Sequence, residues 1–249
     1  MGQVKKTMKK IGRHIWEAFK GSIPSALMYF CAGSILMMLT MKGEEAYAWD
    51  NKKLAWSIVC GLAAVAYNLF VSYAQGGNAY EMLVSGNMKR VSAEQYGEGF
   101  KISTHKEAKE YRVWTGFAIG GFCALFTLLA GVFMGANQAR VNSVFQKGNS
   151  WGVGFGLGVI ACFLLSGWSV LPFFYLNASG VAISYFVSCA FALIPVAATG
   201  GMYIAGAYGR RNKNVRQQEL ADRAARAEAN KPKKINYGGL PGTKPKKRK

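Results

Sequence analysis

Residues 148–209 read GNSWGVGFGLGVIACFLLSGWSVLPFFYLNASGVAISYFVSCAFALIPVAATGGMYIAGAYG, and none of these 62 residues is charged. About a quarter of the residues of an ordinary soluble domain are charged, so an uncharged run of this length is not typical of one. Apolar stretches of about 17–25 residues are long enough to cross a bilayer as helices. The run therefore predicts helices embedded in a membrane.

Other parts of the chain have the same character. Charge-free segments also occupy residues 23–41, 54–75 and 113–136. Within the long run, the turn-forming residues Leu-Asn-Ala-Ser-Gly at 176–180 indicate a break, which gives blocks at about 151–175 and 181–208. We therefore predict an all-α integral membrane protein, a multi-pass transmembrane helix bundle with five hydrophobic blocks.

The composition divides the chain into five segments. They are a basic amphipathic interfacial helix (1–22), the first two transmembrane helices (23–75), a polar, cytoplasmic and partly helical loop (76–112), further transmembrane helices (113–208) and a basic cytoplasmic tail (209–249). Glycine and proline interrupt the region 148–208, and such breaks at membrane depth need cover from protein or a wet cavity. From about residue 231 the tail is mainly Gly, Pro and Lys and is predicted to be disordered.

The leader has the pattern of an interfacial helix. Val4, Met8, Ile11, Ile15 and Phe19 recur at steps of four and three, which places them on one helical face. The lysines and arginine of the leader lie away from this face. A helix of this kind suits the surface of a membrane.

The distribution of basic residues constrains the topology. Lys and Arg accumulate on the cytoplasmic side of short loops. With an even number of crossings, 26 of the 31 Lys and Arg residues lie on the side of the N-terminus, whereas five crossings put most of them on the other side. We therefore prefer an even number among four to six spans, with both termini cytoplasmic. A re-entrant hairpin at 151–176 or three short spans in 148–209 would give that number, and a true five-pass chain is the alternative.

Two features of the polar loop and the apolar blocks bear on local structure. Thr104 and Glu107 have the spacing of a capping box, which predicts a helix that continues into the block at 113. Asn68 lies within an apolar block and is predicted to form an interhelical hydrogen bond. Asn177 is predicted to lie in a turn.

Small residues at four-residue spacing predict close helix packing. The glycines singled out for this role are Gly116, Gly120, Gly131, Gly135, Gly152 and Gly156. Packing within the bundle is the first interpretation, and a dimer seam or narrow pore wall near 152–158 is the second.

The residues predicted to contact anionic lipid or another polyanion belong to the leader and the tail. They are Lys5, Lys6, Lys9, Lys10, Arg13, Arg210, Arg211, Lys213, Arg216, Lys244, Lys246, Lys247, Arg248 and Lys249. Near a membrane surface each such cation contributes on the order of 1 kcal/mol to binding. The run at the C-terminal end, TKPKKRK, could also reach RNA.

The sequence shows no complete catalytic constellation. Gly148-Asn149-Ser150-Trp151-Gly152 matches the pattern G-x-S-x-G, but no histidine follows His105, and a nucleophile elbow needs one later in the chain. The five cysteines are spread over the apolar blocks and no two have C-x-x-C spacing, which does not favour a zinc site. We expect neither enzymatic activity nor a cofactor.

Two hypotheses on function follow. The first is a non-enzymatic membrane protein that acts as a channel-like, transport or scaffold subunit. The alternative is a membrane-anchored recruiter whose basic tail binds anionic lipid or ribosomal RNA. The expected partners are membrane lipids with anionic headgroups at the cytoplasmic face, and further copies of the chain or other membrane subunits. The preferred location is a bacterial cytoplasmic membrane, with a eukaryotic internal membrane as the alternative.

Overall fold

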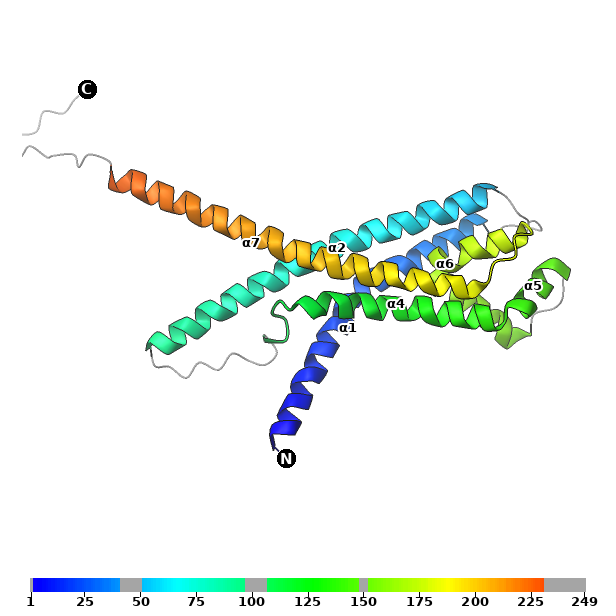
Figure 1. The fold of residues 1–249 in the computed structure, drawn as a ribbon, viewed down its shortest axis with the longest axis horizontal. Helices are drawn as coiled ribbons and strands as arrows, with labels where there is room; N and C mark the ends of the chain where they lie inside the picture. The colour runs from blue at the N-terminus through cyan, green and yellow to red at the C-terminus, as the bar shows by residue number, and fades with distance from the viewer. Residues whose placement is uncertain (1, 41–50, 97–106, 148–151, 231–249) are drawn as a thin grey trace, which may run out of the picture. The chain divides into compact units, whose positions relative to one another are not determined.

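The regular elements of the protein are helices throughout the part that the structure, a computed structural model, describes: residues 2–40, 51–96, 107–147 and 152–230. The elements are α1 (Gly2–Thr40), α2 (Asn51–Tyr96), α4 (Val113–Ala136), α5 (Gln138–Lys147), α6 (Val153–Ala178), the 3₁₀ helix η1 (Tyr185–Ala192) and α7 (Leu193–Ala229) (Figure 1). The chain forms two units, Met1–Arg210 and Arg211–Lys249. We call the first unit 1, and the rest of this description concerns it.

Among the residues that the structure describes, five helical stretches are long and apolar enough to cross a membrane. They are Thr7–Thr40, Asn51–Ser92, Val113–Ala136, Val153–Ala178 and Tyr185–Ala229. The all-helical fold with five such helices is therefore confirmed. The third stretch coincides with the predicted block 113–136, because charged and amide residues flank it closely on both sides.

Side-chain contacts give the directions of the helices in unit 1. The ring of His14 meets that of Trp114 and Gly21 meets Ile119, so α1 and α4 run parallel. Ser25 of α1 hydrogen-bonds Asn68 of α2, and Gln75 of α2 reaches back to Gly21, so α2 returns antiparallel. We call the end of unit 1 where α1 begins the near end, and the end where Thr40 lies the far end.

The last helical stretch of unit 1, formed by η1 and the first part of α7, runs back from the far end to the near end. Phe186 of η1 lies against Gly135 near the end of α4, whereas Tyr203 of α7 lies against Gly116 near its beginning. Thus η1 and α7 together run antiparallel to α4. Arg210, the last residue of unit 1, binds Glu81 in the near-end part of α2.

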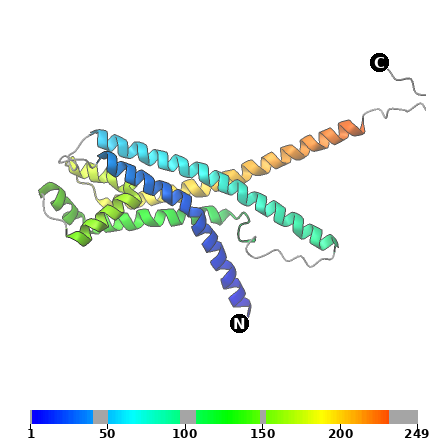
Figure 2. The same cartoon turned by 180° about the vertical axis from the view of Figure 1, so that it is seen from behind.

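Helix α6 doubles back on itself instead of crossing the bundle. The rings of Phe163 and Phe174 are 5.4 Å apart between centroids, although a straight helix would separate residues 11 positions apart by about 16 Å. The helical conformation breaks at Ser166, where φ is −141° and ψ is 25°. Both ends of α6 consequently lie at the far end (Figures 1 and 2).

The turn of α6 lies at mid-depth in unit 1. The Oγ atom of Ser166 is 3.5 Å from Oγ1 of Thr127 in the middle of α4. Gly33 of α1 packs against the carbonyl groups of Phe163 and Leu164, where a side chain on residue 33 would collide. The described part of the region 148–209 thus contains a helical hairpin at 153–178, followed by the η1–α7 stretch.

The predicted break at 176–180 is present between α6 and η1. Gly180 has φ 91°, a left-handed conformation that glycine adopts without strain. Asn177 fastens the link, because its Nδ2 donates to the carbonyl of Ile183 (2.7 Å) and its Oδ1 accepts from the amide of Ile183 (3.2 Å). The turn predicted at Asn177 is displaced, because Asn177 lies in the last turn of α6 and the turn itself begins at Ser179, but the side-chain amide of Asn177 holds the link in place.

The leader differs from the prediction. The separate helix predicted for 1–22 is instead the first part of α1, which continues through Pro24 and bends along its length (Figures 1 and 2). Proline removes a backbone donor and displaces the preceding turn. Carbonyls in that turn accept from neighbouring helices: Gly21 from Nε2 of Gln75 at 2.9 Å, and Ser22 from Sγ of Cys123 at 3.7 Å.

The loop predicted for 76–112 is largely helix. Helix α2 continues to Tyr96 and passes through Gly76 and Gly77 without a break. Gly76 lies directly on the carbonyl of Tyr203, and Gly206 lies directly on the carbonyl of Tyr73, so these glycines serve helix contact rather than a turn. The residues between the apolar blocks at 113–136 and 151–175 likewise contain a helix, α5.

The helix predicted to run from Thr104 into the third block does not form as one piece. Thr104 lies outside the described residues, helical structure ends at Glu107, and Arg112 is extended with φ −143° and ψ 134°. The amide of Tyr111 donates to the carbonyl of Ala79 at 3.0 Å, which holds this segment against α2 instead.

The contact between α2 and α7 gives a direct test. We expect Gly206→Leu to destabilise unit 1 by about 1–3 kcal/mol or more, because the new side chain meets the backbone of Tyr73. Gly201→Leu on the same helix is the matched control, since Gly201 faces open space. Thermal unfolding of the detergent-purified proteins measures both, and equal midpoints would contradict the close contact.

Candidate functional site: a polar cavity and a buried polar network

A network of hydrogen bonds joins three helices around Asn68, which is fully buried. Its Oδ1 accepts from Oγ of Ser25 at 2.6 Å. Its Nδ2 donates to Oγ1 of Thr199 at 2.9 Å and to the hydroxyl of Tyr29 at 3.1 Å. The interhelical hydrogen bond predicted for Asn68 is confirmed, and α1, α2 and α7 all take part in it.

A polar cavity of about 310 Å³ lies on the near-end side of this network. Residues from α1, α2, α4, α7 and the segment before α4 line it. They are Glu17, Lys20, Gly21, Gln75, Asn78, Ala79, Met82, Ala108, Lys109, Glu110, Thr115, Ile119 and Tyr203. Carboxylates and ammonium groups both contribute, so the lining has no strong net charge.

The cavity begins within two helical turns of the Asn68 network. Gly21 is one turn from Ser25 on α1, Tyr203 is one turn from Thr199 on α7, and Gln75 is two turns from Asn68 on α2. The network itself does not line the cavity, and its residues lie one to two helical turns further from the near end.

Gln75 presents an unused acceptor at the cavity wall. Its Nε2 donates to the carbonyl of Gly21, whereas its buried Oε1 has no hydrogen-bond partner among the described residues. Leaving a buried acceptor unpaired costs about 1–3 kcal/mol.

Ion pairs fix the segment that forms one side of the cavity. Arg90 of α2 donates through Nη2 to both carboxylate oxygens of Glu110, at 2.7 and 3.0 Å. Lys10 of α1 donates to Oε1 of Glu107 at 2.6 Å. The hydrogen bond from Lys10 and its charge lower the pKa of Glu107, so this pair is formed at neutral pH and is lost as the pH falls through that lowered pKa.

Some of the cations predicted to contact polyanions have partners within unit 1. Lys10 binds Glu107 and Arg210 binds Glu81. Lys5 and Lys6 lie in the first turns of α1, Lys9 is exposed and Arg13 is half-buried on the same helix. In the second unit, Arg211, Lys213 and Arg216 are exposed. The five predicted cations of the C-terminal run, from Lys244 to Lys249, lie outside the described residues.

Four of the predicted packing glycines line the contact of α4 with the returning chain. Gly116 meets Tyr203, Gly120 meets the backbone of Pro195 and Val196, and Gly131 meets Ser188 and Cys189. Gly135 meets the ring of Phe186. Gly156 is buried in the first arm of α6, and Gly152 precedes that arm near Arg140.

Sequence reasoning missed the glycine pairs with the closest backbone contacts. Gly33 approaches Gly167 across α1 and α6, and Gly76 and Gly206 lie at the crossing of α2 and α7. Each pair joins helices far apart in the chain, so no spacing within one helix signals it. The adjacent glycines Gly76 and Gly77, which lie between helix-forming residues, could have indicated a close helix contact at this place.

The far half of unit 1 is filled by aromatic and aliphatic side chains. Among the buried residues there are Leu36, Met134, Phe163, Phe174, Tyr175 and Tyr185. The two arms of α6 supply most of this cluster. The polar cavity therefore faces a packed aromatic core on the other side of the Asn68 network.

The remaining candidate groups for chemistry are accounted for. Ser150 and His105 lie outside the described residues, and Glu107 and Glu110 are held in ion pairs. The described residues contain no group of three or more His, Cys, Asp or Glu that could hold a metal ion. Comparison with protein-family models, with curated proteins and with solved structures finds no match. The function is therefore argued from the site.

The Asn68 network gives a second test. We expect Asn68→Leu to lower stability by about 1–3 kcal/mol, because the hydroxyls of Ser25, Tyr29 and Thr199 lose their shared partner. Ser34→Ala is the control, since Ser34 bonds only the carbonyl of Phe30 in its own helix. Thermal unfolding in detergent measures the difference. A variant Asn68→Leu as stable as Ser34→Ala would show that the network does not hold the helices together.

Proposed function

We propose that the chain is an integral membrane protein in which α1, α2, α4 and η1–α7 cross the bilayer and α6 is re-entrant. The two arms of α6, residues 153–165 and 167–178, are each about 20 Å long, which is shorter than the hydrocarbon thickness of about 30 Å. The doubling back at Ser166 supports this topology, because an arm of that length cannot cross alone.

The distribution of charge supports the same topology. With four crossings and one re-entrant hairpin, the leader, the residues between α2 and α4 and the tail share one side. That side then holds 26 of the 31 Lys and Arg residues, and by the positive-inside rule it is the cytoplasm. The near end and its polar cavity accordingly face the cytoplasm, in the bacterial cytoplasmic membrane by preference.

Within this topology, the best-supported function is that of a non-enzymatic transport subunit, which admits a small hydrogen-bonding solute from the cytoplasmic side. The observation that supports it is the polar cavity, whose lining residues lie one to two helical turns from the buried Asn68 network. Polar groups at membrane depth are costly and mark solute pathways. Broken helices such as α6 recur where transporters bind their substrates. The aromatic core of the α6 arms closes the pathway in this conformation.

The alternative of a membrane-anchored recruiter rests on the basic tail. Residues 211–229 form the exposed, basic continuation of α7. The C-terminal run that would reach RNA lies outside the described residues. Recruitment of ribosomal RNA or anionic lipid by this tail therefore stays a prediction of the sequence.

The re-entrant hairpin can be tested by thiol labelling. In a variant whose five cysteines are replaced by alanine, Ser143→Cys precedes α6 and Ser179→Cys follows it. We expect both to react with a membrane-impermeant maleimide from the outside of intact cells. Ala221→Cys in the continuation of α7 should react only after the membrane is opened.

The outcome distinguishes the two topologies. Labelling of residues 143 and 179 from opposite sides would show that α6 crosses the membrane and would contradict the re-entrant hairpin. Labelling of residue 221 from outside would place the tail in the external compartment and contradict the assigned orientation.

Transport is tested with purified protein in vesicles. We expect vesicles that contain the protein to take up a small polar solute, such as glycerol or glycine, faster than protein-free vesicles. Thr115→Phe should reduce this uptake because it narrows the polar cavity. Val113→Phe is the matched control on the same turn, since Val113 is exposed and outside the lining.

Osmotic light scattering and radiolabelled solute measure the rates. Uptake that is equal in the Thr115→Phe and Val113→Phe proteins would contradict passage through this cavity. Inserted protein that gives no uptake of any solute and purifies without a partner would count against a transport or scaffold subunit altogether.

A further inference from the structure

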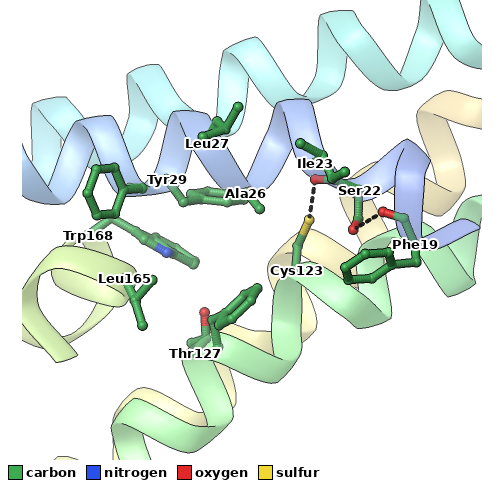
Figure 3. A pocket seen from close by; sticks show the side chains of 12 residues that line it. Phe19, Ser22, Ile23, Ala26, Leu27, Tyr29, Cys123, Thr127, Leu165 and Trp168 are labelled. Atoms are coloured by element: carbon green, nitrogen blue, oxygen red, sulfur yellow. Dashed lines mark hydrogen bonds between the residues drawn. The ribbon is translucent and has the colours of Figure 1, made fainter. Parts of the chain in front are cut away.

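A second cavity, of about 230 Å³, opens between α1, α4 and the turn of α6 (Figure 3). Twelve residues line it, and none of them lines the polar cavity. In Figure 3, Ile23, Ala26 and Leu27 of α1 face Leu165 and Trp168 of α6, with Cys123 and Thr127 of α4 completing the wall. Leu27 and Leu165 are 58% and 41% exposed, so the cavity is open at the surface of the bundle.

Most polar groups in the wall of this cavity already have hydrogen-bond partners within the protein. Oγ of Ser22 donates to the carbonyl of Phe19 at 2.7 Å, and Sγ of Cys123 donates to the carbonyl of Ser22 at 3.7 Å. The hydroxyl of Tyr29 accepts from Asn68. A polar solute would therefore lose its bonds to water and gain few here, whereas a hydrocarbon chain needs only van der Waals contact.

A stripe of residues on α1 leads from the near end into the cavity. Lys9, Arg13, Trp16, Lys20, Ile23, Leu27 and Phe30 follow one another at steps of four and three, which is the spacing of one helical face. The first four are basic or amphipathic, and the last three are apolar and line the cavity. Trp16 is 56% exposed, and Nζ of Lys20 lies 5.7 Å from the centre of its ring.

We propose that this cavity binds one acyl chain of an anionic phospholipid, whose phosphate lies at Arg13 and Lys20. This inference rests on the proposed insertion into a membrane, which supplies the lipid. The headgroup then lies at the level of Trp16, where tryptophan is favoured at a membrane interface. The chain passes along Ile23 and Leu27 and ends against Trp168 and Leu165.

The charge on α1 favours an anionic lipid over a zwitterionic one. A cation near the membrane surface contributes on the order of 1 kcal/mol, or about a fivefold preference. Lys20 is paired with Glu17 at 2.8 Å, but its side chain is 41% exposed and retains further donors. Arg13 can bind two phosphate oxygens with its planar guanidinium group.

Photocrosslinking tests the site. Phosphatidylglycerol with a diazirine on one acyl chain is mixed into vesicles that hold the full-length protein, and phosphatidylcholine with the same label serves in a parallel sample. After irradiation, mass spectrometry locates the labelled residues. We expect phosphatidylglycerol to label segments 23–30, 122–127 and 165–168 in preference to the rest of the lipid-facing surface.

Variants separate the cavity from the surface around it. Ala26→Phe fills the cavity and should lower labelling of these three segments several-fold, whereas Ala63→Phe on an exposed face of α2 should not. Arg13→Gln should reduce the preference for phosphatidylglycerol by about fivefold and leave labelling by phosphatidylcholine unchanged. The unfolding midpoint of each variant shows whether it is folded.

Three results would overturn the proposal. They are labelling spread evenly around the apolar surface, labelling unaffected by a folded Ala26→Phe protein, and equal labelling by the two lipids. Failure of the proposed membrane insertion looks different, because the protein would then be washed from the vesicles at alkaline pH before irradiation. Inserted protein without labelling in the cavity contradicts the lipid site alone.

Discussion

The turn of α6 at Ser166 determines where every later residue of unit 1 lies. A helix that breaks at mid-depth exposes carbonyl groups that no longer bond within the helix, and these must be covered by protein. Gly33 provides that cover, because without a side chain α1 can approach the carbonyls of Phe163 and Leu164 directly. Both arms then return to the far end, and η1–α7 is left to bring the chain back. If α6 were straight, it would end at the near end. Residue 185 would then lie at the near end and residue 210 at the far end, which is the reverse of what is observed.

The same turn divides unit 1 into two unlike halves. The arms of α6 fill the far half with aromatic rings, such as Phe163 against Phe174, and leave the near half to the four long helices alone. Those four helices cannot close completely at the near end, because α7 pairs with α2 through Gly76 and Gly206 while the leader of α1 bends away. The polar cavity occupies the space that results. Its position follows from the packing and not from a motif in the sequence.

The sequence predicted the helical class, the block 113–136 and the turn at 176–180, because composition alone decides these features. The sequence also showed that five apolar blocks disagree with the even number of crossings that the basic residues favour. It gave no sign that the turn would lie at Ser166 and Gly167. The sequence could not predict which residues meet across helices. The close contacts of Gly33 and Gly206 and the unpaired acceptor of Gln75 depend on neighbours that are distant in the chain. The long continuation of α2 was missed because the polar composition of 76–112 predicted a loop, whereas Gly76 and Gly77 pack against α7 within the helix.

The turn of α1 that precedes Pro24 lies between the two cavities, since Gly21 lines the polar one and Ser22 lines the apolar one. Proline frees carbonyls in the preceding turn, and the helix is held there from both sides: Gly21 accepts from Gln75, which lines the polar cavity, and Ser22 accepts from Cys123, which lines the apolar one. Each cavity therefore contributes one donor to the same turn of α1. The bond to Gly21 uses Nε2 of Gln75, whereas Oε1 of the same side chain stays unpaired among the described residues.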